Sequence, residues 1–170
     1  MDLKQICEER YSVRHYTSEP VSQEDLDYLL ECARLAPSAC NRQPWKFVVA
    51  QSAEAREKVC QCASRFTWMN EAPLFIIGFR NTEENWIRRK DGKQHGDIDL
   101  AIATEHICLA AAERGLGTCW VCAYDPQKMA ETFPIPGYEA VVIIPVGHRD
   151  PEEKRPAKLR KDRNEIVEVI

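Results

Sequence analysis

Apolar positions along the chain follow two kinds of spacing, helical periodicity and short continuous runs. Leu26, Leu29, Leu30, Ala33 and Ala36 recur at the spacing of one helix face. Ser22 stands at the N-cap position of this helix, with Asp25 three residues later, and Pro37 is expected to end it. The pattern predicts further helices over residues 3–10, 52–64 (capped by Ser52) and 97–114, and a short one with Asp125 as N-cap and Pro126 at its first position.

Continuous apolar runs predict strands over residues 46–51, 74–79, 118–123 and 140–146. Runs that are apolar on both faces indicate a sheet covered by helices on both sides, in an α/β or α+β sandwich whose topology the pattern leaves open. The helix over 97–114 is apolar on nearly every side and is therefore expected at the centre of the structure. Residues 81–96 are polar, with Gly92 and little periodicity, and predict a loop.

Length and composition indicate one ordinary globular domain over residues 1–170. The chain is 44% apolar and 29% charged with a net charge of -4, which argues against a protein that coats nucleic acid or an anionic membrane. No apolar run approaches the ~20 residues of a membrane helix, and the first residues show no export signal. Eight cysteines without framework spacing then predict buried, reduced thiols and a cytoplasmic protein.

Two basic segments, one near each end of the chain, are candidates for binding an anion. Arg10 and Arg14 flank Ser12, and their planar donors would suit a phosphate. In the tail, Lys158 and Arg160 alternate, so that an extended chain would present both on one side. The alternative for each segment is ordinary solvated surface charge.

A loop and a glycine-rich segment supply two further candidates. The connection over 36–45 is rich in small residues and amides and could meet a flat polar ligand, or Asn41 and Gln43 could satisfy local backbone groups. The glycines of 115–117 permit close backbone approach or end a helix. Cys119 and Cys122 have the spacing of a redox dithiol, but they lie within a predicted strand, where positions three apart face opposite sides. No zinc-ligand spacing is found among the cysteines and histidines.

Taken together and in order, these segments resemble the FMN-dependent nitroreductase family over nearly the whole chain. The resemblance rests on RYSVRHYTSEPV (10–21), ARLAPSACNRQPWKFVV (33–49), DIDLAIATEHICLAAAERGLGTCWV (97–121) and IIPVGHRDPEEKRPAKLRK (143–161). It implies an α+β fold, a three-layer α/β/α sandwich that forms an intertwined homodimer. One FMN is then expected at each of two subunit interfaces, with the tail of about 150–170 wrapping over the partner subunit.

The same resemblance assigns the cofactor contacts, which are Arg10, Tyr11, Ser12, Arg14, Pro37, Ser38, Ala39, Asn41, Val121, Cys122, Lys158 and Arg160. Arg14 would support the ring electrostatically, Lys158 and Arg160 would clasp the phosphate, and the loop over 37–41 would reach the FMN held mainly by the other subunit. Residues 65–70 lack a lysine found in larger members, and residues 81–96, with Trp86, are the candidate roof of the substrate pocket.

The implied activity is a ping-pong cycle. FMN takes a hydride from NADH or NADPH and then reduces a small-molecule acceptor such as a nitroaromatic or a quinone. Neither a side-chain acid or base nor a metal is assigned, because FMN carries the chemistry. Two alternatives remain open, a flavin-binding module without turnover and a thiol-redox protein that uses Cys119 and Cys122.

Overall fold

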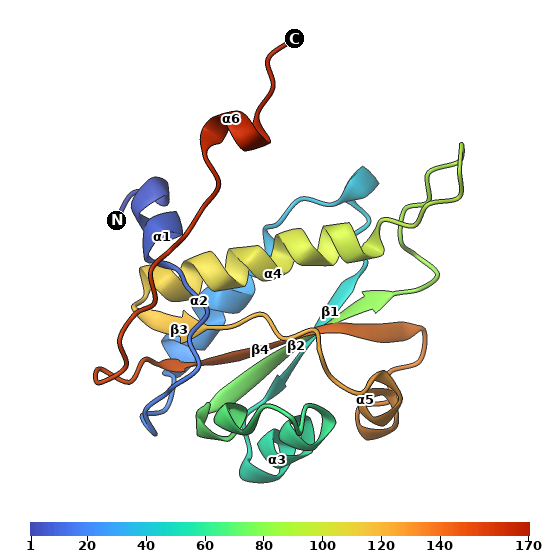
Figure 1. Ribbon diagram of the computed structural model, residues 1–170. Coiled ribbons are helices and arrows are strands. Elements are labelled where there is room, and N and C mark those ends of the chain that lie inside the picture. Colours follow the sequence, from blue (N-terminus) through green and yellow to red (C-terminus); the bar gives the residue numbers. More distant parts are fainter.

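A four-stranded antiparallel sheet of order β1-β2-β4-β3 lies between two layers of helices (Figure 1). The computed structural model describes residues 1–170. The strands are β1 (Trp45–Ala50), β2 (Leu74–Asn81), β3 (Leu116–Thr118) and β4 (Tyr138–His148). The helices are α1 (Leu3–Glu9), α2 (Gln23–Arg34), α3 (Ala53–Cys62), α4 (Gly96–Glu113), α5 (Pro126–Thr132) and α6 (Arg163–Ile166), with short 3-10 helices η1 (Ala39–Asn41) and η2 (Thr67–Glu71).

The two faces of the sheet carry separate apolar cores. Along β2, Phe75 and Ile77 pack into a core that includes residues of α3 and α5. The alternating neighbours Leu74 and Ile76 belong to a core with α2 and α4 on the opposite face. The predicted three-layer α/β/α sandwich is therefore confirmed.

The predicted helix starts are confirmed by their caps. The side-chain oxygens of Ser22, Ser52 and Asp125 each accept a backbone N–H of the first turn of α2, α3 and α5. The end of α2 comes earlier than predicted, with Leu35 as C-cap. This difference follows from Pro37, which disfavours helical backbone at the residue before it.

The prediction of a strand over 118–123 is wrong in its bounds. β3 covers only Leu116–Thr118, and beyond it a single bridge joins Val121 to Ile143 of β4. Thr118 pairs with Val146, so the same register would place Cys119 opposite Pro145. Because a proline has no N–H to donate, the ladder is interrupted there and resumes at Val121.

Gly117 allows the N-terminal segment to lie directly against β3. A Cβ at this position would stand 2.7 Å from Cγ2 of Val13, which is buried. The N–H of Val13 donates to the carbonyl of Thr118 at 2.9 Å, and Ser12 forms a parallel bridge with Thr118. Gly115, in contrast, has a φ of 76° and ends helix α4. Of the two predicted roles, Gly117 therefore has the close backbone approach and Gly115 has the helix end.

Replacing Gly117 with valine is expected to destabilise the fold by about 2 kcal/mol or more, because Val13 and the backbone of residues 12–14 would have to move. Urea denaturation followed by circular dichroism measures this loss. Ala123→Val, at an exposed position, is the control and is expected to stay within about 0.5 kcal/mol of the parent. Equal stability of the Gly117→Val protein would contradict the close approach.

Helix α4 runs across the sheet but is not covered on all sides. Ile107 and Cys108 are fully buried, as the apolar pattern predicts, whereas Ile98 is 45% and Ile102 36% exposed. The prediction of a central helix thus holds for one face of α4 within a single chain. No helix in the structure has the length and apolar character needed to cross a membrane.

The tail after Asp150 runs along α1 and then leaves the body of the molecule at α6 (Figure 1). Its apolar side chains are unprotected, with Leu159 84% and Val169 90% exposed. Neither apolar core contains a residue beyond Val146. The tail therefore contributes nothing to the core of its own chain.

Candidate functional site

Basic residues from both ends of the chain meet beside the C-terminal end of α1. The ammonium of Lys158 donates to the carbonyl oxygens of Arg10 at 2.6 Å and Glu8 at 3.3 Å, and also to that of Cys7. Arg155 pairs with the carboxylate of Glu9 at 2.7 Å. The tail is thus fastened to α1 of the same chain, and Lys158 stabilises the helix end through its carbonyls.

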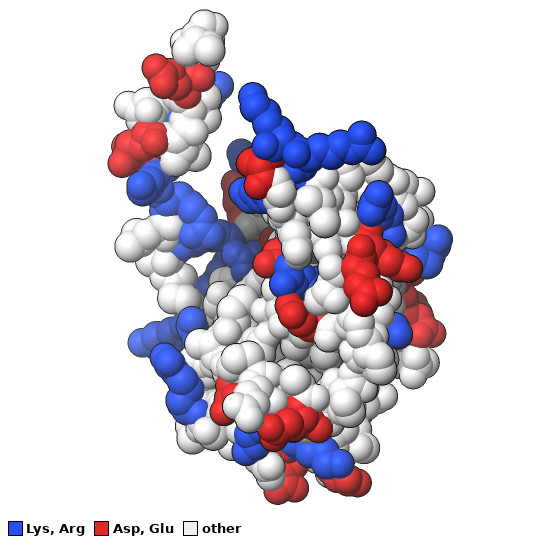
Figure 2. Space-filling model, turned by 90° about the vertical axis from the view of Figure 1, so that its right-hand side faces the viewer, with Lys and Arg blue, Asp and Glu red and all other residues white.

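Arg10, Arg155, Lys158 and Arg160 form what we call the cation cluster. Burial lowers the pKa of Lys158, and the positive charges of Arg10, Arg160 and Arg155 lower it further. The contacts of Lys158 and Arg155 with the end of α1 thus gather several positive charges in one place, which attracts an anion. Figure 2 shows Lys and Arg side chains along the tail and next to its junction with the body.

The N-terminal basic segment and the glycine-rich segment come together at β3. Burial raises the pKa of Cys119, and Arg14, a hydrogen bond with Ser12, and Arg10 act in the opposite direction. Ser12 and Arg14 therefore lie next to the start of the segment that leads to Val121 and Cys122. Val121 is buried, and its backbone exchanges two hydrogen bonds with Ile143.

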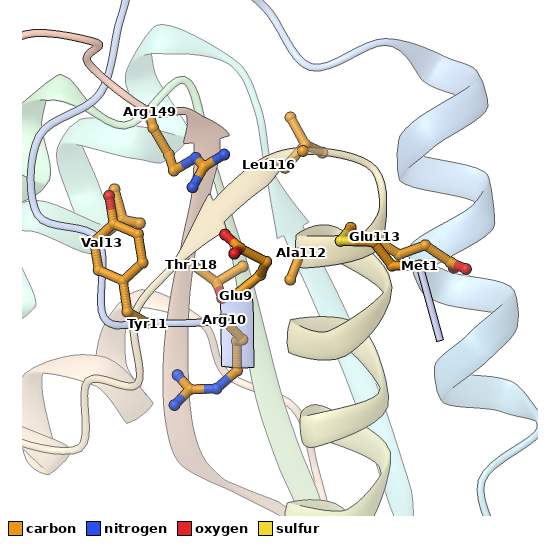
Figure 3. A pocket seen from close by; sticks show the side chains of 11 residues that line it. Met1, Glu9, Arg10, Tyr11, Val13, Ala112, Glu113, Leu116, Thr118 and Arg149 are labelled. Atoms are coloured by element: carbon orange, nitrogen blue, oxygen red, sulfur yellow. The ribbon is translucent and has the colours of Figure 1, made fainter. Parts of the chain in front are cut away.

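A cavity of about 160 Å³ borders this region and is lined by Arg10, Tyr11, Leu116, Thr118 and Arg149 among others (Figure 3). The guanidinium groups of Arg155 and Arg149 lie 5.3 Å and 6.0 Å from the centroid of the Tyr11 ring. The Tyr11 ring thereby makes cation–π contacts with both arginines. Neither Ser12 nor Arg14 lines the cavity, so the cavity borders only part of the N-terminal basic segment.

Residues Pro37, Ser38, Ala39 and Asn41 lie elsewhere in the chain, at the other end of α4. The N–H of Ala39 donates to Oδ1 of Asp99 in the first turns of α4 at 2.9 Å. Figure 1 shows α1 at the opposite, C-terminal end of that helix. A single chain therefore does not bring this loop to the cation cluster, and the prediction that the loop reaches a cofactor on the other subunit stays a prediction.

The loop itself has an unusual backbone held by local hydrogen bonds. Cys40, Asn41 and Gln43 have φ values of 52°, 53° and 50°, in the left-handed region. The N–H of Gln43 donates to Ser38 Oγ at 2.8 Å, and its amide nitrogen donates to the carbonyl and side-chain oxygens of Asn41. The local hydrogen bonding considered for Asn41 and Gln43 is therefore present.

The thiols differ from the prediction of burial. All eight cysteines are free, but Cys7, Cys40 and Cys122 are exposed. Cys7 is exposed because α1 buries only Ile6. Burial raises the pKa of both Cys119 and Cys122, which opposes the thiolate that dithiol chemistry needs. The structure holds no group of three or more His, Cys, Asp or Glu side chains suited to a metal ion.

The sequence patterns did not identify two acidic residues of α4 that contact the candidate segments. Asp99 is 3% exposed and binds Ala39, and Glu105 pairs with Arg10 at 3.6 Å. An acidic residue within an otherwise apolar helix usually has a partner in the structure. This pattern in the sequence could have identified both residues.

Comparison with known proteins shows the family and the fold of the chain. The family model described as the nitroreductase family matches residues 7–64 and 59–148. An FMN reductase [NAD(P)H] of Bacillus subtilis is 30% identical over 171 residues, covering 91% of this chain and 68% of that protein. A nitroreductase family protein from Clostridium difficile 630 superposes with a TM-score of 0.90 at 35% identity, covering 99% of this chain and 98% of that one. An FMN-dependent nitroreductase from Clostridium difficile R20291 gives 0.83 at 28% identity, covering 96% of each chain.

Proposed function

Because the chain belongs to the nitroreductase family, we propose that it is an NAD(P)H-dependent FMN oxidoreductase. The observation that carries the proposal is the cation cluster, in which Lys158 and Arg155 fasten the tail to the end of α1 beside Arg10. A phosphate monoester carries close to two negative charges at neutral pH, and guanidinium groups match its geometry. The guanidinium groups of Arg10 and Arg160 therefore fit the phosphate of FMN. The expected clasp by Lys158 is not found in the single chain, because its ammonium donates to three backbone carbonyls and fastens the tail instead.

Bound FMN would supply the redox chemistry, taking a hydride from NADH or NADPH and passing electrons to an organic acceptor. The chain supplies position and charge. Arg10 and the tail cations are assigned to the phosphate end, because Lys158 donates to the carbonyl of Arg10 and so holds the tail beside it. Arg14 is assigned to the ring end, because it follows Val13, whose N–H donates to the carbonyl of Thr118 beside the segment that leads to Val121 and Cys122.

At the ring end, Arg14 would place a fixed positive charge where the reduced cofactor gains negative charge, which favours reduction. Ser12 adds a hydroxyl donor, and Val121 and Cys122 offer backbone groups. No side chain is given the role of general acid, since water can supply the proton to the acceptor.

We propose nitroaromatics, quinones or similar molecules as acceptors in a ping-pong cycle. The loop over 81–96 is the candidate wall of the acceptor site. It is joined to the loop over 36–45 by Arg42, whose guanidinium donates to the carbonyls of Glu84 at 3.1 Å and Asn85 at 3.3 Å. Trp86 packs edge-on against His95 at the base of this loop, with ring centroids 4.7 Å apart.

We further propose that the active form is a homodimer. Ile98 and Ile102 of α4 and the apolar residues of the tail are exposed in the single chain. A second copy that covers them would also bring the loop over 37–41 to the cation cluster of its partner. This arrangement would complete the cofactor contacts that one chain leaves divided between the two ends of α4.

Anaerobic mixing with NADH tests the proposed activity. The purified protein is expected to be yellow and to lose its absorbance near the flavin maximum when NADH or NADPH is added, because hydride transfer reduces FMN. An oxidised spectrum that persists would favour a flavin-binding module without turnover. A colourless protein that takes up no FMN, and whose activity disappears in Cys119→Ala, would favour the thiol-redox alternative.

A further inference from the structure

Glu105, in the middle of α4, joins two of the segments assigned to the cofactor. Its Oε1 lies 3.6 Å from Nε of Arg10, and its Oε2 accepts a hydrogen bond from the indole Nε1 of Trp120 at 3.2 Å. Trp120 directly precedes Val121 and Cys122. One carboxylate thus connects the N-terminal segment, the central helix and the segment after β3.

The contact uses only one side of the Arg10 guanidinium. Arginine has five N–H donors, and Glu105 lies at the Nε edge. The Arg10 side chain makes no other ion pair. Its two terminal nitrogens, which form the fork that matches a phosphate, are therefore free for an anion. Figure 3 shows the Arg10 side chain extending away from Arg149 and Leu116.

This pair differs from an ordinary surface ion pair. The Arg10 side chain is only 19% exposed, and that of Glu105 is 42% exposed. The charge of Glu105 also acts on the buried thiol of Cys108. Burial raises the pKa of this thiol to about 12, and the negative charge of Glu105 contributes to the rise. The ion pair is therefore less screened by water than an exposed pair, and the hydrogen bond from Trp120 restricts the rotation of the Glu105 carboxylate.

The backbone of Arg10 is restrained as well, since its carbonyl accepts from Lys158 at 2.6 Å. Arg10 is thus held at the main chain by the tail and at Nε by Glu105. These two contacts favour one orientation of the guanidinium before an anion arrives.

We propose that Glu105 is a positioning residue, which orients the Arg10 guanidinium toward the phosphate of FMN, while the hydrogen bond from Trp120 holds the Glu105 carboxylate in place. This inference rests on the proposed function. It assigns Glu105 no contact with the cofactor, so its whole effect on FMN binding passes through Arg10.

The test compares FMN with riboflavin, which has the same ring but no phosphate, by fluorescence titration of the apoprotein. Glu105→Ala is expected to raise the dissociation constant for FMN about tenfold, as expected for a charge-assisted contact that is lost, and to leave riboflavin affinity within about twofold. In an Arg10→Ala background the same change is expected to have no further effect on FMN. Glu105→Gln, which keeps an acceptor oxygen, is expected to lose less affinity than Glu105→Ala.

Glu31→Gln is the matched control, because Glu31 forms an exposed pair with Arg34 on α2. It is expected to bind both flavins like the parent. Equal losses for FMN and riboflavin, additive losses in the double variant, or tighter FMN binding by Glu105→Gln would each overturn the proposal. A parent protein that binds no FMN would instead overturn the proposed function, so the two failures are distinguishable.

Discussion

Replacing Arg14 with alanine is expected to weaken FMN binding about tenfold or more, because a fixed positive charge beside the ring is lost. The same loss is expected for riboflavin, since Arg14 is assigned to the ring rather than to the phosphate. The reduction potential of bound FMN is also expected to fall, because the reduced, more negative form loses more stabilisation than the oxidised form. Fluorescence titration and anaerobic redox titration measure these effects.

Arg34→Ala serves as the control for Arg14. Arg34 is an exposed arginine of α2 that pairs with Glu31, away from β3. Its removal is expected to change neither flavin affinity nor potential. Unchanged potential and affinity in Arg14→Ala would show that the guanidinium does not act at the ring, and the division into a phosphate end and a ring end would fail.

Deleting residues 151–170 is expected to have the largest effect of all on FMN retention, a loss of about a hundredfold or more, because Arg155, Lys158 and Arg160 are removed together. The body should still fold, because neither apolar core includes a residue of the tail. Fluorimetry of released FMN, circular dichroism and sedimentation velocity follow cofactor, fold and assembly separately. The shortened chain is expected to sediment as a monomer.

The variant Arg160→Ala separates the effect on FMN retention from the effect on assembly. The guanidinium of Arg160 hydrogen-bonds only to the carbonyl of Leu159, so its removal leaves the contacts between the tail and α1 in place. Reduced FMN retention with an intact dimer is expected for this variant. A shortened chain that remains a flavin-loaded dimer would contradict both the phosphate assignment and the role of the tail between subunits.

The sequence predicted the elements whose signals are local. The caps at Ser22, Ser52 and Asp125 act within one helical turn, so the residues that decide them are neighbours in the chain. The length of β3 could not be predicted in the same way. It depends on Pro145, which lies on another strand and reaches Cys119 only through the register of the sheet.

The candidate site shows the same division. The basic segments were recognisable from composition, whereas their orientation depends on non-local partners. Lys158 was expected to face a phosphate, yet its ammonium donates to three carbonyls around the end of α1. Asp99 and Glu105 acquire their roles only when α4 is placed against the loop over 36–45 and against Arg10.

The break in the ladder beside Pro145 has a consequence for variation at the cofactor site. Pro145 has no N–H to donate to the carbonyl of Cys119. The main chain between Thr118 and Val121 is therefore not paired with β4, although no residue is inserted there. Main-chain atoms are the same whichever amino acid is present. A flavin contact made through the main chain of this segment would therefore persist when its side chains are exchanged.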